Sequence, residues 1–201
     1  GSRCQVVIIQ TDGEQAVDEH IKPPEIENHP EFVKAIRASG LVGLGGAGFP
    51  THIKMNPKNL SEVDTLVVNA AECEPYITSD YRTIIERPQD ILDGIAAIKK
   101  YVGITQVKIA VENNKPQAIE MLRRLTGDDP SIEVCSLKAI YPKGAEKVTA
   151  YETTGRVIKE GMLPADVGVI VENVTTTAFI GQYLRTGMPL VTKTLTVDGG
   201  A

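Results

Sequence analysis

A loop with a high density of glycine is the first feature whose residue types could do chemistry. Residues 40–51 read GLVGLGGAGFPT and place five glycines in nine positions. Glycine permits positive φ angles and lets backbone N–H groups approach a phosphate or a flat ring closely. A structural turn needs only one or two glycines, so this loop is predicted to lie against a ligand. A helix expected to begin near Thr51 would add its positive end to such a site.

The spacing within this loop also matches a known pattern. Gly43, Gly45 and Gly48 fit G-x-G-x-x-G letter by letter. The dinucleotide fingerprint requires a strand immediately before it, but the preceding residues 31–40 have helical spacing. We therefore expect glycine backbone to contact a ligand without an ordinary Rossmann fingerprint.

Three more loops are rich in polar residues and each follows an apolar run. They read NAAECEPYITSDYR (69–82), YPKGAEK (141–147) and VENVTTT (171–177). In open α/β sheets ligands bind outside the carboxyl ends of the strands, on such loops. Loops are commonly polar whatever their role, so the distribution alone fits plain solvent-exposed connections as well as a ligand cleft.

The elements that must position these loops alternate between strand and helix. Expected strands cover residues 5–9, 64–70, 107–112, 132–137, 167–173 and 190–197. Expected helices cover residues 32–40, 80–98 with a break at Pro88, and 147–154. Two more are expected, one that carries Ile119, Leu122 and Leu125 and one that runs through Phe179 and Leu184. Uninterrupted apolar strands are typical of parallel sheets buried on both faces. The sequence predicts an α/β fold of three layers, with a mainly parallel sheet and helices on both faces.

Composition narrows the class of protein and of partner. The chain has 201 residues, 42% hydrophobic and 23% charged, which suits one globular core. Its net charge is −5 and its basic residues are scattered, which disfavours nucleic acid and anionic membranes as partners. No apolar run approaches the roughly 20 residues that a membrane span requires. We expect a cytoplasmic location and no direct membrane span.

The cysteines lie too far apart in the sequence to form a metal centre. Cys4, Cys73 and Cys135 lie far apart and form no C-x-x-C, so neither a zinc nor an iron–sulfur site is expected from them. Cys73 is interpreted as a small packing residue. Any redox chemistry is therefore expected to come from an organic cofactor or from another chain.

Four segments together resemble a known family. GLGGAGFPT, NAAECEPYITSDYR, YPKGAEK and VENVTTTAFI are similar to the C subunit of Rnf-type ion-translocating electron transport complexes, called RnfC or RsxC. They are more distantly similar to the flavin-carrying, NADH-binding subunit of respiratory complex I. The resemblance runs from about Gly40 to the end of the chain.

The resemblance implies a Rossmann-like FMN/NADH-binding core of the complex I flavin-subunit type. It divides the chain into residues 1–39 with an N-terminal strand, an arm and a short helix, residues 40–189 as the core, and residues 190–201 as the start of a following domain. Two [4Fe–4S] clusters are expected only in a C-terminal part that this sequence lacks.

The implied activity is that of an NADH-dependent flavin oxidoreductase. Hydride would pass between NAD(H) and FMN, and single electrons would continue to iron–sulfur clusters outside this chain. A flavin suits this position because it is stable in one-electron and two-electron chemistry. The implied partners are the other Rnf subunits and, indirectly, ferredoxin, at the cytoplasmic face of the inner membrane. The fragment could be inactive alone.

The resemblance also assigns cofactor-binding residues, and it requires no separate catalytic residue and no metal ligand. In the first two loops they are Gly43, Gly45, Gly46, Gly48, Phe49, Lys54, Asn69, Glu72 and Glu74. The glycines would pack on the flavin and the dinucleotide, Phe49 would stack on adenine, and the two glutamates would face flavin and nicotinamide. Lys54 could instead be an ordinary surface lysine, and the glutamates could be simply solvated.

The remaining assigned residues lie in the later loops. They are Tyr141, Gly144, Glu146, Glu172, Asn173, Thr175 and Thr176. The last four would hold the flavin phosphate at a helix start, although Asn173 or Thr175 could be nothing more than a helix cap.

Two other functions stay open at the level of sequence. A cobalamin-reductase-type flavoprotein subunit shares these motifs. A non-catalytic docking module could retain the fold and bind no flavin.

Overall fold

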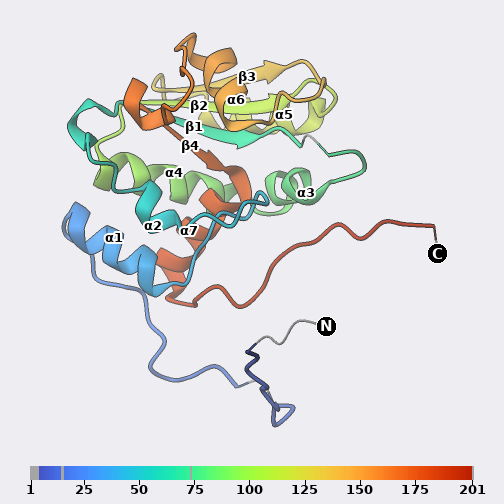
Figure 1. Cartoon of the computed structure of the whole chain (residues 1–201). Helices are drawn as coiled ribbons and strands as arrows, with labels where there is room; N and C mark the ends of the chain where they lie inside the picture. The colour runs from blue at the N-terminus through green and yellow to red at the C-terminus, as the bar shows by residue number, and fades with distance from the viewer. Residues whose placement is uncertain (1–4, 15, 73, 201) are drawn as a thin grey trace.

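A four-stranded parallel sheet is the centre of the molecule (Figure 1). The computed structural model describes residues 5–14, 16–72 and 74–200. The strands are β1 (Thr65–Ala70), β2 (Gln106–Glu112), β3 (Ile132–Leu137) and β4 (Val169–Asn173), in the order β3-β2-β1-β4. These four expected strands are confirmed. Cys4 and Cys73 lie outside the described residues, and so does the packing role expected for Cys73.

The helices also follow the predicted pattern. They are α1 (His29–Ala38), α2 (Thr51–Lys54), α3 (Ser79–Glu86), α4 (Pro88–Val102), α5 (Pro116–Thr126), α6 (Glu146–Thr154) and α7 (Val174–Thr186), with short 3-10 turns η1 (Leu60–Glu62) and η2 (Pro164–Val167). Pro88 begins α4 and so separates it from α3, because proline is tolerated in the first turn of a helix.

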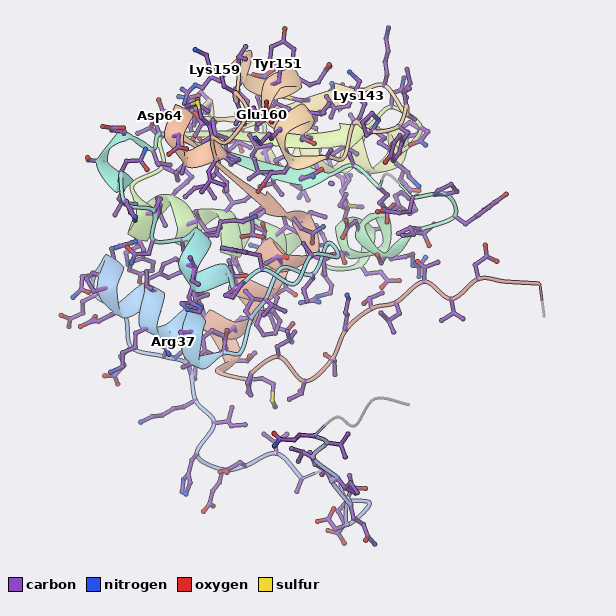
Figure 2. The ribbon with its side chains drawn as sticks, viewed as in Figure 1. Arg37, Asp64, Lys143, Tyr151, Lys159 and Glu160 are labelled. Carbon is purple, nitrogen blue, oxygen red and sulfur yellow. The ribbon has the colours of Figure 1, made fainter. Side chains whose placement is uncertain are left out.

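Both faces of the sheet are covered, so the predicted three layers are confirmed, but the layers are unequal. The larger apolar cluster joins one face to α1, α4, α5 and α7. The smaller cluster joins Val67, Ala110 and Val171 on the other face to Ala150 of α6. Figure 2 shows Tyr151 on the α6 side and Arg37 of α1 on the opposite side, and both side chains are exposed.

The strand order creates a switch point between β1 and β4. From β1 the chain adds β2 and then β3 on one side, whereas β4 pairs on the other side of β1. At the carboxyl ends of these two strands Asn69, the residue before the end of β1, is in register with Asn173, the last residue of β4. Ligands of doubly wound sheets bind in the crevice outside the carboxyl ends at such a point.

Helix α7, which begins directly after β4, crosses α4 at very close range. A Cβ on Gly94 would lie 2.0 Å from the Thr177 carbonyl oxygen, and a Cβ on Gly181 would lie 2.2 Å from that of Asp90. Two glycines are therefore necessary for this crossing, since any side chain there would force the helices apart.

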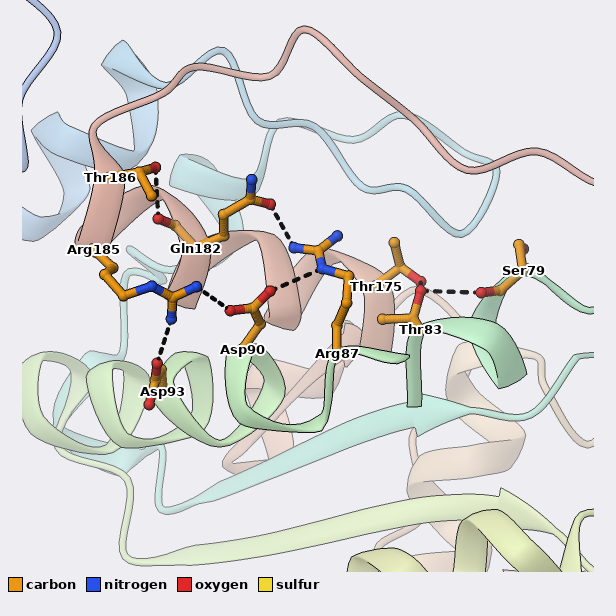
Figure 3. Close-up of polar contacts among 9 residues, drawn as sticks. All are labelled: Ser79, Thr83, Arg87, Asp90, Asp93, Thr175, Gln182, Arg185 and Thr186. Carbon is orange, nitrogen blue, oxygen red and sulfur yellow. Dashed lines mark hydrogen bonds and ion pairs between the residues drawn. The ribbon is translucent and has the colours of Figure 1, made fainter. Parts of the chain in front are cut away.

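Charged side chains flank the same crossing (Figure 3). Arg87 Nε donates to Asp90 Oδ2 at 2.8 Å, and Arg185 pairs with both Asp90 and Asp93. Gln182 accepts a further hydrogen bond from Arg87. These contacts fix α7 along its length against α4.

The end of the sheet opposite the switch point has its own anchor. Arg156 donates to both carboxylate oxygens of Asp64, at 2.7 and 2.9 Å, and also to the Val167 and Gly168 carbonyl oxygens. The Arg156 hydrogen bond holds the pKa of the Asp64 carboxyl below its usual value. This contact ties the segment before β4 to the start of β1.

Two expected strands and one expected helix need correction. Residues 5–9 and 190–197 form no strand, because within the described chain they pair with no sheet edge. Their apolar side chains are exposed except that of Leu190, which is half-buried against the core. Figure 1 shows both terminal segments running away from the sheet. The helix expected near Thr51 is only the four residues of α2, too short to offer a substantial dipole.

No helix in the described ranges combines the length and the apolar character needed to cross a bilayer.

Candidate functional site

A cavity of about 850 Å³ opens beside the switch point. One wall is the glycine loop, from Gly43 to Phe49, and another is strand β4, from Val169 to Asn173. Asn69, Gly144 and Glu146 contribute from the ends of β1 and of the loop before α6. The remaining lining comes from residues 53–54, 56–59 and 163–166.

The glycine loop is held at its base and open at its tip. Val42 and Pro50 form an antiparallel bridge, and Gly43 N–H donates to the Phe49 carbonyl oxygen at 2.8 Å. Gly46 and Gly48 have φ angles of +129° and +64°, which favour glycine. The tip from Gly45 to Phe49 is exposed, so its backbone faces the cavity.

The loop is also docked on the start of α7. Leu44 N–H donates to Thr176 Oγ1 at 2.9 Å. A Cβ on Gly45 would lie 3.1 to 3.3 Å from atoms of the Asn173 side chain. The missing side chain at Gly45 therefore lets the loop lie directly on Asn173.

Lys54 reaches across the cavity wall from α2. Its Nζ lies 2.9 Å from Glu146 Oε1 and 2.9 Å from the Val171 carbonyl oxygen. Burial alone would lower the pKa of this ammonium, but the negative charges of Glu172 and Glu146 outweigh it and raise the pKa. Lys54 is therefore a fixed positive charge on the wall.

Glu172 is a buried carboxyl on the same wall, with only 1% of its surface exposed. Asn173 N–H donates to its Oε1 at 3.2 Å, whereas Oε2 has no hydrogen-bond partner in the described chain. Burial raises the pKa of Glu172 to about 7, although Lys54 acts in the opposite direction. A buried polar atom without a partner is uncommon in folded proteins, and Glu172 also lines the cavity.

Asn69 and Asn173 lie at the carboxyl ends of the two strands at the switch point. Asn69 Nδ2 donates to the Gly144 carbonyl oxygen at 2.8 Å, which ties β1 to the loop before α6. Asn173 caps α7, because its Oδ1 accepts from Thr176 N–H at 3.1 Å. Both side chains border the cavity, and both also hold neighbouring loops in place.

The structure therefore gathers most of the predicted site residues around one cavity. Those that line it are Gly43, Gly45, Gly46, Gly48, Phe49, Lys54, Asn69, Gly144, Glu146, Glu172 and Asn173.

Five predicted residues do not line the cavity. Glu74 and Tyr141 are exposed outside it, and Thr175 and Thr176 are buried residues of the first turn of α7. Glu72 is turned inward: its Oε1 accepts from Asp80 N–H at 2.8 Å, and Lys115 Nζ lies 3.6 Å from its Oε2. That separation allows ionic attraction but no hydrogen bond. In this geometry Glu72 supports the start of α3 and does not line the cavity.

Asp80 is a residue that the sequence interpretation passed over. Its Oδ2 accepts from Asn173 Nδ2 at 2.7 Å and its Oδ1 accepts from Thr175 Oγ1 at 2.6 Å. Burial raises the pKa of Asp80, and these two hydrogen bonds oppose that effect. The sequence did contain a signal for Asp80, because it is a third carboxylate in the 69–82 segment and lies just inside a helix start.

The cavity segments 56–59 and 163–166 also went unpredicted. Asn59 Nδ2 donates to the Ala165 carbonyl oxygen at 2.7 Å, which joins the two segments. Neither segment has a motif or a periodic pattern, so nothing in the sequence places them beside the glycine loop.

The sequence of this chain is similar to known proteins. Residues 36–182 match the family described as the Nuo51 FMN-binding domain. The chain is 42% identical over 204 residues to the C subunit of the Na(+)-translocating ferredoxin:NAD(+) oxidoreductase complex of Acetobacterium woodii, covering 100% of this chain and 46% of that protein. It is 38% identical to the proton-translocating counterpart of Clostridium ljungdahlii, covering 99% of this chain and 44% of that protein.

A solved structure shows the same fold. The crystal structure of an NAD+-reducing [NiFe]-hydrogenase in the air-oxidized state superposes with a TM-score of 0.66 and 22% identity, over 78% of this chain and 30% of that one. The chain spans less than half the length of the two curated relatives above. Over the matched core, this chain belongs to the Nuo51 FMN-binding domain family.

Proposed function

We propose that the cavity beside Asn69 and Asn173 binds FMN and admits NAD(H) to the same cleft. The observation that carries this proposal is the convergence of the glycine loop, the ends of β1 and β4, and Lys54 on one cavity at the switch point. A cavity of about 850 Å³ lies within the usual size of small-molecule sites. Membership of an FMN-binding family supports the same assignment.

The residues present fit a flavin nucleotide. Gly46 and Gly48 have positive φ angles and no side chains, so a flat ring system can lie directly on the backbone there. Lys54 supplies a positive charge for a phosphate or for the electron-rich edge of the ring. The unpartnered Oε2 of Glu172 offers a hydrogen-bonding atom to a polar edge of the ligand.

When bound, FMN exchanges a hydride with NAD(H) and single electrons with one-electron carriers. The protein's part is to bind both molecules, orient their rings and exclude water, so no general base is required. Phe49 is half-exposed at the mouth of the cavity and is available to stack on an adenine.

The wider context of the proposal comes from the curated relatives, which are named as subunits of ion-translocating ferredoxin:NAD(+) oxidoreductase complexes. We infer that this chain is the NADH:FMN module of an Rnf-type complex. Electrons would then pass to iron–sulfur clusters outside this chain and indirectly to ferredoxin. Contact with the cytoplasmic face of the membrane would come through the other subunits.

A flavin titration tests the proposal directly. Adding the protein to FMN should quench flavin fluorescence in a saturable manner, and anaerobic NADH should then bleach the flavin absorbance. Lys100→Ala, an exposed change on α4 away from the cavity, should leave both signals unchanged. If neither the chain nor a full-length version binds FMN, the flavin assignment is wrong and the docking function is favoured.

A further inference from the structure

We propose that Asp80 is a positioning residue of the flavin site, which sets the orientation of the Asn173 amide and thereby the wall on which the glycine loop rests. This inference rests on the proposed function. The juxtaposition that carries it links three segments far apart in sequence: the start of α3, the start of α7 and the glycine loop.

Asp80 holds the start of α7 through two side chains. Its Oδ2 accepts from Asn173 Nδ2 at 2.7 Å, and its Oδ1 accepts from Thr175 Oγ1 at 2.6 Å. Asn173 lines the cavity, whereas Asp80 does not. Asp80 therefore acts on the site through Asn173.

These contacts leave the Asn173 amide only one orientation. A carboxylate can only accept hydrogen bonds and a backbone N–H can only donate. Asp80 faces the Nδ2 end of the amide, and Thr176 N–H faces the Oδ1 end. A flipped amide would set oxygen against oxygen and N–H against N–H, so Asp80 and the helix backbone together exclude it.

The fixed amide is also the surface under the glycine loop. A Cβ on Gly45 would lie 3.1 Å from Asn173 Nδ2, and Leu44 N–H donates to Thr176 Oγ1, which itself lies 3.3 Å from Asn173 Oδ1. Rotation of the Asn173 side chain would therefore disturb the loop that we propose contacts the flavin.

Asp80 is itself held before any ligand binds. Its N–H donates to the buried Glu72 carboxyl at 2.8 Å. Behind it, Thr83 Oγ1 donates to the Ser79 carbonyl oxygen at 3.0 Å and lies 2.9 Å from Thr175 Oγ1 (Figure 3). This explains why Glu72 points inward: it supports Asp80.

Asp80→Ala, the first test, removes the acceptor. We expect FMN affinity to fall at least about tenfold, while Asp80→Asn keeps most of it, because its amide oxygen can still accept from Asn173 and its NH₂ can donate to Thr175. Asp129→Asn, which breaks a partly buried ion pair with Lys99 away from the cavity, is the control for loss of a carboxylate and should bind FMN normally.

Exchanging the acid and the amide between positions 80 and 173 distinguishes loss of this contact from loss of folding. Asn173→Asp places a carboxylate against Asp80 and should weaken FMN binding. The double variant Asp80→Asn with Asn173→Asp restores a donor–acceptor pair, with Asp as a competent helix cap, and should recover affinity. A double variant that binds no better than Asn173→Asp alone would overturn the proposal.

Amide hydrogen exchange without FMN separates this inference from the proposed function. Asp80→Ala should speed exchange at the Leu44 and Thr176 amides and leave β1 and β2 unchanged. Absence of that change, together with wild-type FMN affinity, would overturn the positioning role. Failure of the wild-type protein to bind FMN, with exchange altered as expected, would overturn the proposed function and leave the positioning contact supported.

Discussion

The polar chemistry of the cavity depends on a few buried or half-buried side chains. Lys54 lies between Glu146 and the β4 backbone, and the buried Glu172 on the same wall has one unpartnered oxygen. Because folding removes these groups from water, it shifts their pKa values. Substitutions that change the charge or the available space at single positions therefore test this part of the site.

Glu172→Gln should change how stability depends on pH. The folded pKa of Glu172, about 7, exceeds its ordinary value of 4.5, so the folded state holds the extra proton between these values. Its contribution to stability is fully present below pH 4.5 and is lost as pH rises through 7. We expect the free energy of unfolding of the wild type to fall by roughly 3 kcal/mol more than that of the variant between pH 4 and pH 8.

Urea unfolding at several pH values measures this difference. Glutamine keeps the acceptor for Asn173 N–H, so the folded structure should be retained. Parallel stability curves for the two proteins would show that folding leaves the pKa of Glu172 at its ordinary value and that burial does not control its proton.

Gly45→Ala should disturb the contact between the glycine loop and Asn173. The added Cβ would lie 3.1 to 3.3 Å from that side chain, which must then move by a few tenths of an ångström. We expect FMN affinity to fall by about tenfold and stability by about 1 kcal/mol, measured by flavin fluorescence and thermal unfolding. Gly43→Ala, whose Cβ would meet its nearest atom at 3.6 Å, should have the smaller effect; the reverse order would contradict the packing described.

At the scale of elements, the position of α7 is the main determinant of the site. Its capping residue, Asn173, is also the last residue of β4, so strand and cavity wall are continuous. Glycines and charged side chains fix α7 on α4. A change far from the cavity can therefore reach it through this helix.

Gly94→Ala tests the helix crossing. Its Cβ would lie 2.0 Å from the Thr177 carbonyl oxygen, and a backbone atom cannot move aside alone. We expect a loss of roughly 3 kcal/mol in unfolding free energy and weaker FMN binding, because α7 must shift. Ala96→Ser, at an exposed position two residues further along α4, should cost less than about 0.5 kcal/mol; equal losses in both variants would refute the close crossing.

At the scale of the whole molecule, a folded core carries two extended terminal segments. Val7 and Ile8 are 87% and 89% exposed, and Val197 is 91% exposed. Such exposed apolar segments contribute little to the stability of the core and favour association with other chains.

Removing the residues up to Glu14 tests this description. The thermal midpoint should change by less than about 2 °C, because the described side chains of this segment bury almost nothing. Self-association measured by analytical ultracentrifugation should decrease with the loss of Val6 to Ile9. A large drop in the midpoint would mean that the segment packs on the core.

The sequence alone determined the elements and the class of fold. Apolar runs such as residues 66–68 are buried in the sheet, and the break at Pro88 separates two helices, because local patterning and backbone chemistry decide these features. It also indicated that the glycine loop and the ends of β1 and β4 border the cavity, since the ends of parallel strands meet at one edge of a sheet, but it gave no sign of residues 56–59 and 163–166.

Only the tertiary structure decided which polar side chains face the cavity. Glu72 and Glu172 both follow apolar runs, yet one supports Asp80 and the other borders the cavity. The direction of a polar side chain, its burial and its hydrogen-bond partner depend on residues brought together from distant segments. No local sequence pattern encodes these properties. For the same reason Asp80 was missed and strands were expected in the terminal segments: a hydrogen-bonded partner exists only once the chain has folded.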